Sequence, residues 1–171
     1  MRDGSRTRSV ASSAKTALAV LGLALSGVVG EVQARQHVVR LVTDSEAGRF
    51  RFDPPLLFAA PGDEVTFVPE SRLHAVKSIG GTLPDGVRPW RGRMGETLTV
   101  RLDAPGVYGL KCPAHYQIGM VGLVVVGPHP VNWSRARAVR HPEMADEELR
   151  HLFGLAACQL GPPVDAECVS Q

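Results

Sequence analysis

The sequence predicts a mainly β protein, a Greek-key sandwich or barrel, followed by a C-terminal extension of two helices. Short segments rich in β-branched and apolar residues alternate with Gly and Pro turns up to residue 126, as in sandwiches and barrels. After Gly127 the apolar residues change to helical spacing. A length of 171 residues allows one domain with appendages rather than two full domains.

Residues 1–34 have the pattern of a signal peptide. Basic residues open the segment, an apolar run follows from 16 to 30, and Val32-Gln33-Ala34 forms a small-residue cleavage site. A membrane anchor is the alternative, but the run is shorter than the roughly 20 residues that span a bilayer. We expect Sec-type export to the periplasm, cleavage before Arg35, and a soluble mature protein without membrane attachment.

Seven segments are predicted to be strands, and those at 64–68 and 97–102 alternate apolar and polar residues as half-buried strands do. The seven segments are residues 35–43, 50–52, 56–59, 64–68, 97–102, 107–112 and 121–126. Pro54-Pro55 places its neighbours at a sheet edge or a bulge, because proline lacks the N–H of a ladder bond. Aromatic residues make up only 5% of the chain, so the interior is expected to be mostly Val, Leu and Ile.

Two helices are predicted after the strands, a short one at 132–139 and a longer one from Pro142. Proline suits the first turn, and the acidic residues that follow favour the positive end of the helix dipole. An apolar stripe on the longer helix should pack on the sandwich, and it consists of Leu149, Leu152, Phe153 and Ala156. Met144 and Phe153 are expected to pack in the core. No spacing joins His129, His141 and His151 in a metal site, so we expect them on the surface.

The turn between the last two predicted strands brings together a thiol, an imidazole and a thioether. Cys112, His115 and Met120 follow the pattern C-x2-H-x4-M. Thiolate and thioether are soft ligands that suit Cu(I), and a His2Cys set with a weak axial Met is the blue-copper arrangement. Structural zinc sites are usually closed by paired cysteines, and this segment has one. Chance spacing remains the alternative for these three residues alone.

A second imidazole has to come from another part of the chain. His74 follows the strand predicted at 64–68 and a short loop, which makes it a candidate. The alternative is a surface histidine or one that is satisfied in the core. With His74 the ligand order becomes His, Cys, His, Met.

The segments PGDEVTF, GVYGLKC, HYQIGM and VGLVVVG, together with His74, resemble pseudoazurin, a family of small blue-copper proteins within the cupredoxins. The resemblance spans about residues 38–160. It implies a cupredoxin-like domain at 35–128, a helical extension at 129–171, and one type 1 copper ion held by His74, Cys112, His115 and Met120. It also implies one-electron transfer between Cu(I) and Cu(II) rather than an enzymatic reaction. The chain departs from the family pattern with Ala75 after His74 and with Pro113-Ala114 in the loop.

The family resemblance further implies that the electron leaves through the exposed edge of His115, inside an apolar patch that includes Pro69, Ala114 and Ile118. Basic residues around this edge match positions where the family binds an acidic partner, commonly copper nitrite reductase or another periplasmic enzyme. They are Arg72, Arg91, Arg93 and Lys111. An ordinary solvated face is the alternative for these residues. We expect a monomer that binds neither nucleic acid nor membranes.

Two other functional classes are the alternatives to electron transfer. A multicopper enzyme would need paired H-x-H motifs, and the sequence has none. A copper chaperone or storage protein would bind Cu(I) through several Met or Cys residues, without colour.

The two remaining cysteines, Cys158 and Cys168, lie close together in the C-terminal tail. In an oxidising compartment they can form a disulfide, which would stabilise the fold by roughly 2 to 3 kcal/mol. Two free thiols are the alternative.

Overall fold

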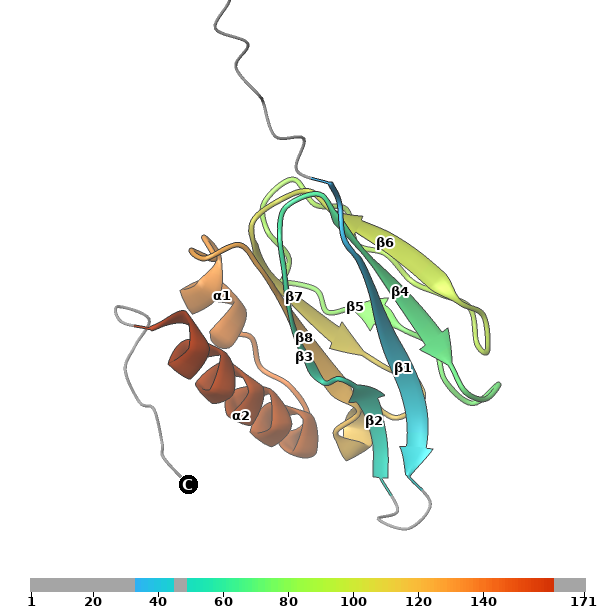
Figure 1. Ribbon diagram of the computed structural model, residues 1–171. Coiled ribbons are helices and arrows are strands. Elements are labelled where there is room, and N and C mark those ends of the chain that lie inside the picture. Colours follow the sequence, from blue (N-terminus) through green and yellow to red (C-terminus); the bar gives the residue numbers. More distant parts are fainter. Residues whose placement is uncertain (1–32, 45–48, 162–171) are drawn as a thin grey trace, which may run out of the picture. The chain divides into compact units, whose positions relative to one another are not determined.

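Two four-stranded sheets pack face to face in the computed structural model, which describes residues 33–44 and 49–161 (Figure 1). The first sheet has the strand order β2-β1-β4-β6 and the second the order β3-β8-β7-β5. The first is built from β1 (Gln36–Asp44), β2 (Arg49–Asp53), β4 (Asp63–Pro69) and β6 (Leu98–Leu102). The second is built from β3 (Leu56–Ala59), β5 (Lys77–Ser78), β7 (Gly106–Lys111) and β8 (Val121–Val126). The predicted β sandwich is thus confirmed.

All seven predicted strands are present: those at 56–59 and 121–126 have the predicted bounds, and no end of the other five is shifted by more than one residue. The strand that the sequence did not predict is β5, two residues long, which lies in the connection after His74 and pairs with β7. Pro54-Pro55 lies where the chain leaves β2 and enters β3 in the other sheet. Both of these strands stand at an edge of their sheet, as the prolines predicted.

The residues of β8 are buried on both faces, which explains their uninterrupted apolar run. Val124 and Val126 belong to the core between the two sheets. Val121, Leu123 and Val125 belong to a second core, which they share with the C-terminal helices. The buried hydrophobic residues are mostly Val and Leu, as the scarcity of aromatic residues predicted, and Phe52, Phe67 and Tyr108 are among the largest fully buried residues.

The two predicted helices are α1 (Trp133–Arg137) and α2 (Glu143–Leu160), and they cover the outer face of the second sheet (Figure 1). The predicted stripe of α2 is buried against β8. The prediction for Met144 was wrong, because its side chain is 55% exposed. It lies one position before Ala145, which begins the buried face, and so points about 100° away from that face.

Two further predictions concern histidines and cysteines of the extension. His129 and His151 are exposed as expected. His141 is half-buried instead, because its ring Nδ1 lies 2.7 Å from the hydroxyl of Tyr116. Cys158 on α2 is disulfide-bonded. Its predicted partner Cys168 lies outside the described residues, as does nearly all of the predicted signal peptide.

No helix in the described ranges is both long enough and apolar enough to span a membrane.

Candidate metal centre

Three of the four predicted ligands come together at one end of the sandwich. Cys112 follows β7, His115 lies in the turn that leads to β8, and His74 follows β4. Their ligand atoms all lie within 4.8 Å of one another, and His74 and Cys112 are completely buried. The Sγ atom of Cys112 lies 3.6 Å from Nδ1 of His115.

Backbone hydrogen bonds hold the loop from Cys112 to Met120 in a tight turn. The Cys112 N–H donates to the Met120 carbonyl at 3.0 Å, and the Met120 N–H donates to the His115 carbonyl at 3.1 Å. A short 3-10 helix, η1 (Tyr116–Ile118), ends at Gly119, whose φ of 87° is left-handed. A Cβ on Gly119 would also lie 3.3 Å from the Met144 carbonyl oxygen, so glycine fits this position best.

Met120, the fourth predicted ligand, is completely buried next to this set. Backbone hydrogen bonds join Met120 to Cys112 and His115, so its thioether side chain projects from the same turn as those two ligands. Its role as the axial ligand stays a prediction.

His74 is fixed on both its backbone and its ring. Its carbonyl accepts a hydrogen bond from the Gly95 N–H at 2.8 Å, and its Nε2 lies 2.8 Å from the hydroxyl of Thr43. The other ring nitrogen, Nδ1, is buried without a hydrogen-bond partner among the described residues. A buried nitrogen without a partner is unfavourable unless something binds its lone pair. The structure therefore leaves Nδ1 available for a metal.

Both imidazoles are kept in the neutral state that a metal requires. Burial, followed by the neighbouring charge of His115, lowers the pKa of His74. Burial likewise lowers the pKa of His115. The set contains one thiol and two imidazoles and no carboxylate. This donor chemistry fits copper better than magnesium or calcium, which prefer oxygen ligands.

Sequence analysis missed two residues, Thr43 and Phe50, that support the imidazoles. They are cross-strand partners in the β1–β2 pairing, so both side chains lie on the same face of the sheet. The Phe50 ring stacks on the His115 ring with 4.1 Å between centroids and 2° between planes. It also meets the His74 ring edge-on at 5.8 Å. Strand register, which residue patterns alone left undefined, was the signal needed to find them.

The metal loop is also tied to the helical extension. Besides its contact with His141, the Tyr116 ring carries the Lys111 ammonium group 4.1 Å above its centroid. Burial, followed by the charge of Lys77, lowers the pKa of Lys111.

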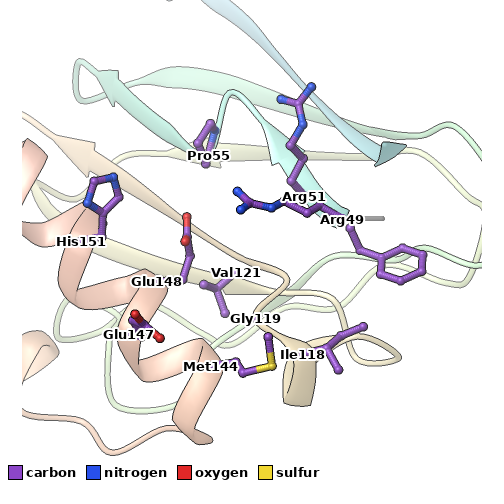
Figure 2. Close-up of a pocket in the computed structure, with 11 residues that line it drawn as sticks. Arg49, Arg51, Pro55, Ile118, Gly119, Val121, Met144, Glu147, Glu148 and His151 are labelled. Atoms are coloured by element: carbon purple, nitrogen blue, oxygen red, sulfur yellow. The ribbon is translucent and has the colours of Figure 1, made fainter. Parts of the chain in front are cut away.

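A cleft of about 800 Å³ opens beside the loop, between β2 and α2. Figure 2 shows Glu147, Glu148 and His151 of α2 on one wall and Arg49 and Arg51 of β2 on the other. Phe50, Ile118 and Met144 supply apolar surface. None of the predicted ligands lines the cleft, so it gives a small molecule no direct access to them.

Comparisons with known proteins agree with this geometry. Residues 39–127 match the family described as copper binding proteins, plastocyanin/azurin family. Pseudoazurin of Paracoccus pantotrophus is 38% identical over 81% of this chain and 92% of its own length. Pseudoazurin of Methylorubrum extorquens is 36% identical over 80% of this chain and 92% of its own length. The solved pseudoazurin structure from Methylobacterium extorquens AM1 has a TM-score of 0.68 at 36% identity, covering 71% of this chain and 99% of its own.

Proposed function

The chain belongs to the pseudoazurins of the plastocyanin/azurin family of copper-binding proteins, and from that premise we propose that it carries single electrons to a respiratory enzyme in the periplasm. The observation that carries the proposal is the convergence of one thiol and two imidazoles within 4.8 Å. His74, Cys112 and His115 would hold one copper ion, with Met120 as a weak axial ligand. Such an ion supplies one-electron chemistry between Cu(II) and Cu(I).

The protein's own contribution is a ligand set that does not rearrange. Strand ends, backbone hydrogen bonds and the contact between Thr43 and His74 fix the ligands from several directions. A site that keeps one geometry in both redox states needs little reorganisation when the electron moves. The cleft beside the site does not reach the ligands, which also favours a carrier over an enzyme.

The electron leaves through His115 in this proposal, because His115 is half-buried whereas His74, Cys112 and Met120 are fully buried. Several exposed apolar side chains lie close to the ligands in the sequence, and in this proposal they form the contact surface for the partner. They are Leu73, Met94, Ala114 and Ile118. Pro69, which the sequence placed in this patch, is half-buried.

The acidic partner docks on basic residues around this surface. Arg72, Arg91 and Arg93 are exposed and can meet its carboxylates, Arg93 by exchanging its long ion pair with Glu96 at 4.0 Å. Lys111 is half-buried over Tyr116, so we assign it a smaller share of docking than the three arginines. A copper nitrite reductase is the partner we propose, by analogy with the family.

The first test is the colour of the copper-loaded protein. Adding Cu(II) to the copper-free protein should produce an intense visible absorption from the thiolate-to-copper transition. Cys112→Ser should lose that absorption because its hydroxyl stays protonated and is a hard ligand, whereas the exposed His129→Ala should keep it. Colourless binding of Cu(I) alone would contradict the proposal and indicate a chaperone or storage protein.

The second test addresses docking. Reversing charge in Arg91→Glu/Arg93→Glu should slow association with copper nitrite reductase and flatten its dependence on ionic strength. The control is Arg101→Glu, because Arg101 on β6 stands opposite Glu64 at the start of β4, the end of the sheet remote from the ligands. Equal association rates in both variants would exclude the basic docking surface.

A further inference from the structure

A buried carboxylate lies where the described chain enters β1, at the end of the first sheet remote from the metal centre. Asp63 is 3% exposed. Its Oδ1 accepts a hydrogen bond from the backbone N–H of Arg35 at 2.8 Å. Its Oδ2 accepts one from the N–H of Ala60 at 2.9 Å and lies 2.8 Å from Nε2 of His37. Both oxygens are therefore fully engaged.

Asp63 is an anion at neutral pH. Burial by itself would raise its pKa, but the hydrogen bonds from His37, Ala60 and Arg35 outweigh burial and lower the pKa to about 2. Buried charges in proteins are usually paired with an opposite charge. Within the described ranges, the ion pair of Asp63 is with His37 alone, which is a cation only when protonated.

The neighbouring side chains do not supply the missing cation. The Arg101 guanidinium on β6 is bound to Asp103 at 2.7 Å. Glu64, the next residue of β4, adds a further carboxylate that accepts a hydrogen bond from the Gln36 side chain. In the uncut chain the Arg35 nitrogen is a neutral amide, so it offers a dipole but no charge. Among the residues that the structure describes, this buried anion therefore has no permanent counter-charge.

We infer that Asp63 is the binding site for the α-ammonium group that forms when a peptidase specific for small side chains cuts between Ala34 and Arg35. Hydrolysis of that bond consumes one water, leaving a carboxylate on Ala34 and an ammonium group on Arg35. The nitrogen that gains the charge already lies 2.8 Å from the carboxylate. Gln33, Ala34 and Arg35 are exposed and precede β1, so the strand ladder is not broken by the cut. Cleavage thus completes the buried ion pair.

Only cleavage at this one peptide bond places the new ammonium group against Asp63. Each residue of extended chain moves the terminus by about 3.3 Å, so an ammonium group one residue earlier or later lies outside hydrogen-bonding distance. An α-ammonium group bound to an anion has a pKa above its ordinary value of about 8. Its stabilising effect is complete below that unfolded value and is lost as the pH rises through the folded one. His37, Glu64, Arg101 and Asp103 are the other ionisable groups around it, and the cut alters none of them covalently.

The experiment uses the full chain, exported by a bacterial host and purified in the copper-loaded form. Intact mass gives the first residue. Brief treatment with acetic anhydride over a pH series then gives the pH of half-maximal reactivity of the terminal amine. We expect a terminus at Arg35 and a midpoint about one unit higher in the folded than in the denatured protein.

Two variants localise the effect. Asp63→Asn should return the midpoint to that of the denatured chain, and Glu64→Gln, which removes the adjacent carboxylate, should keep it raised. A first residue other than Arg35, or equal midpoints in folded and denatured wild-type protein, would overturn the inference. The comparison of folded with denatured wild-type protein needs no variant, so it tests the inference even if Asp63→Asn does not fold. The blue colour reports the metal centre independently of these results.

Discussion

Each imidazole of the metal centre is supported by one residue of a single cross-strand pair. Thr43 on β1 contacts the His74 ring, and Phe50 opposite it on β2 stacks on the His115 ring. Because one hairpin supplies both supports, a change in the β1–β2 register would disturb both ligands together. The two contacts differ in chemistry, so they affect different properties of the copper.

We expect Thr43 to determine how firmly His74 binds the metal. Since Nδ1 is the nitrogen left for the metal, Nε2 carries the hydrogen and donates it to the Thr43 hydroxyl. Losing such a support typically costs 10- to 100-fold in metal affinity. We expect Thr43→Val to lower copper affinity about tenfold in a competition titration with a chelator, and Thr43→Ser to retain it. Thr66→Val, which removes an exposed hydroxyl paired with Thr99 on the same sheet, should have no effect; an equal loss there would refute the assignment.

We expect Phe50 to determine how readily His115 leaves the copper. The reduced ion tolerates three ligands, so His115 can dissociate and take up a proton in acid. The stack of Phe50 on His115, worth roughly 1 kcal/mol, opposes that step, because the His115 ring loses the stack when it dissociates from the copper. We expect Phe50→Leu to raise the pH of this transition in the reduced protein by about 0.7 unit. The pH dependence of the reduction potential measures it, with the remote Phe58→Leu as the control; the same transition pH in all three proteins would count against the stack.

At the scale of elements, Asn132 joins the helical extension to the sandwich. It stands at the start of α1, but its side chain makes no capping hydrogen bond. Instead its Oδ1 accepts from the Val107 N–H at 2.7 Å, and its Nδ2 donates to the Thr82 and Val107 carbonyls at 2.9 and 3.0 Å. Asparagine at the start of a helix is typically a cap, but Asn132 instead forms a buried bridge to β7. The helical spacing of the sequence did not reveal this bridge.

Removing this bridge should lower stability without altering the copper. Asn132→Ala leaves the buried Val107 N–H without a partner and should cost about 3 kcal/mol in the free energy of unfolding. Urea unfolding of the copper-free protein measures this loss, and the exposed Ser134→Ala on the same helix is the control. The visible spectrum should stay the same, because Asn132 contacts the start of β7 and Cys112 follows its end. A loss below 0.5 kcal/mol, about the low end for one net hydrogen bond, would argue against the bridge.

For the whole molecule, patterns along the chain were sufficient where each element has its own local signal. Short apolar and β-branched segments between turn residues placed the seven longer strands, helical spacing placed α2, and the spacing of Cys112 and His115 indicated the metal. Contacts set by tertiary packing were not predictable in this way. The two-residue strand β5 has no period of its own, and Met144 lies one position from the buried face. Thr43 and Phe50 depend on strand register, which a residue pattern alone leaves undefined.

Stability in acid depends on ionisable groups at both ends of the sandwich, and their pH ranges differ. In the copper-free protein, burial lowers the pKa values of His74 and His115. As the pH falls below about 6.5, these two residues take up protons in the unfolded chain before they do so in the folded one, and the folded state loses stability. Asp63 acts at lower pH, because its pKa is about 2 when folded against 3.8 for the model group. Its stabilising effect is complete above about pH 4 and is lost as the pH falls through 2.

Asp63→Asn should therefore abolish the loss of stability between pH 4 and pH 2, which is due to Asp63. The loss below about pH 6.5, which is due to the two histidines, should remain. At pH 7 we expect the variant to be less stable by about 2 kcal/mol, since the missing carboxylate forfeits the free energy stored in its pKa shift. The difference from wild type should shrink between pH 4 and pH 2, because wild-type Asp63 becomes protonated there. Urea unfolding of the copper-free proteins at a series of pH values measures both effects. Asp103→Asn, which removes an exposed carboxylate directly after β6, is the matched control. A difference between wild type and Asp63→Asn that stays constant down to pH 2 would show that the carboxylate is not held as an anion.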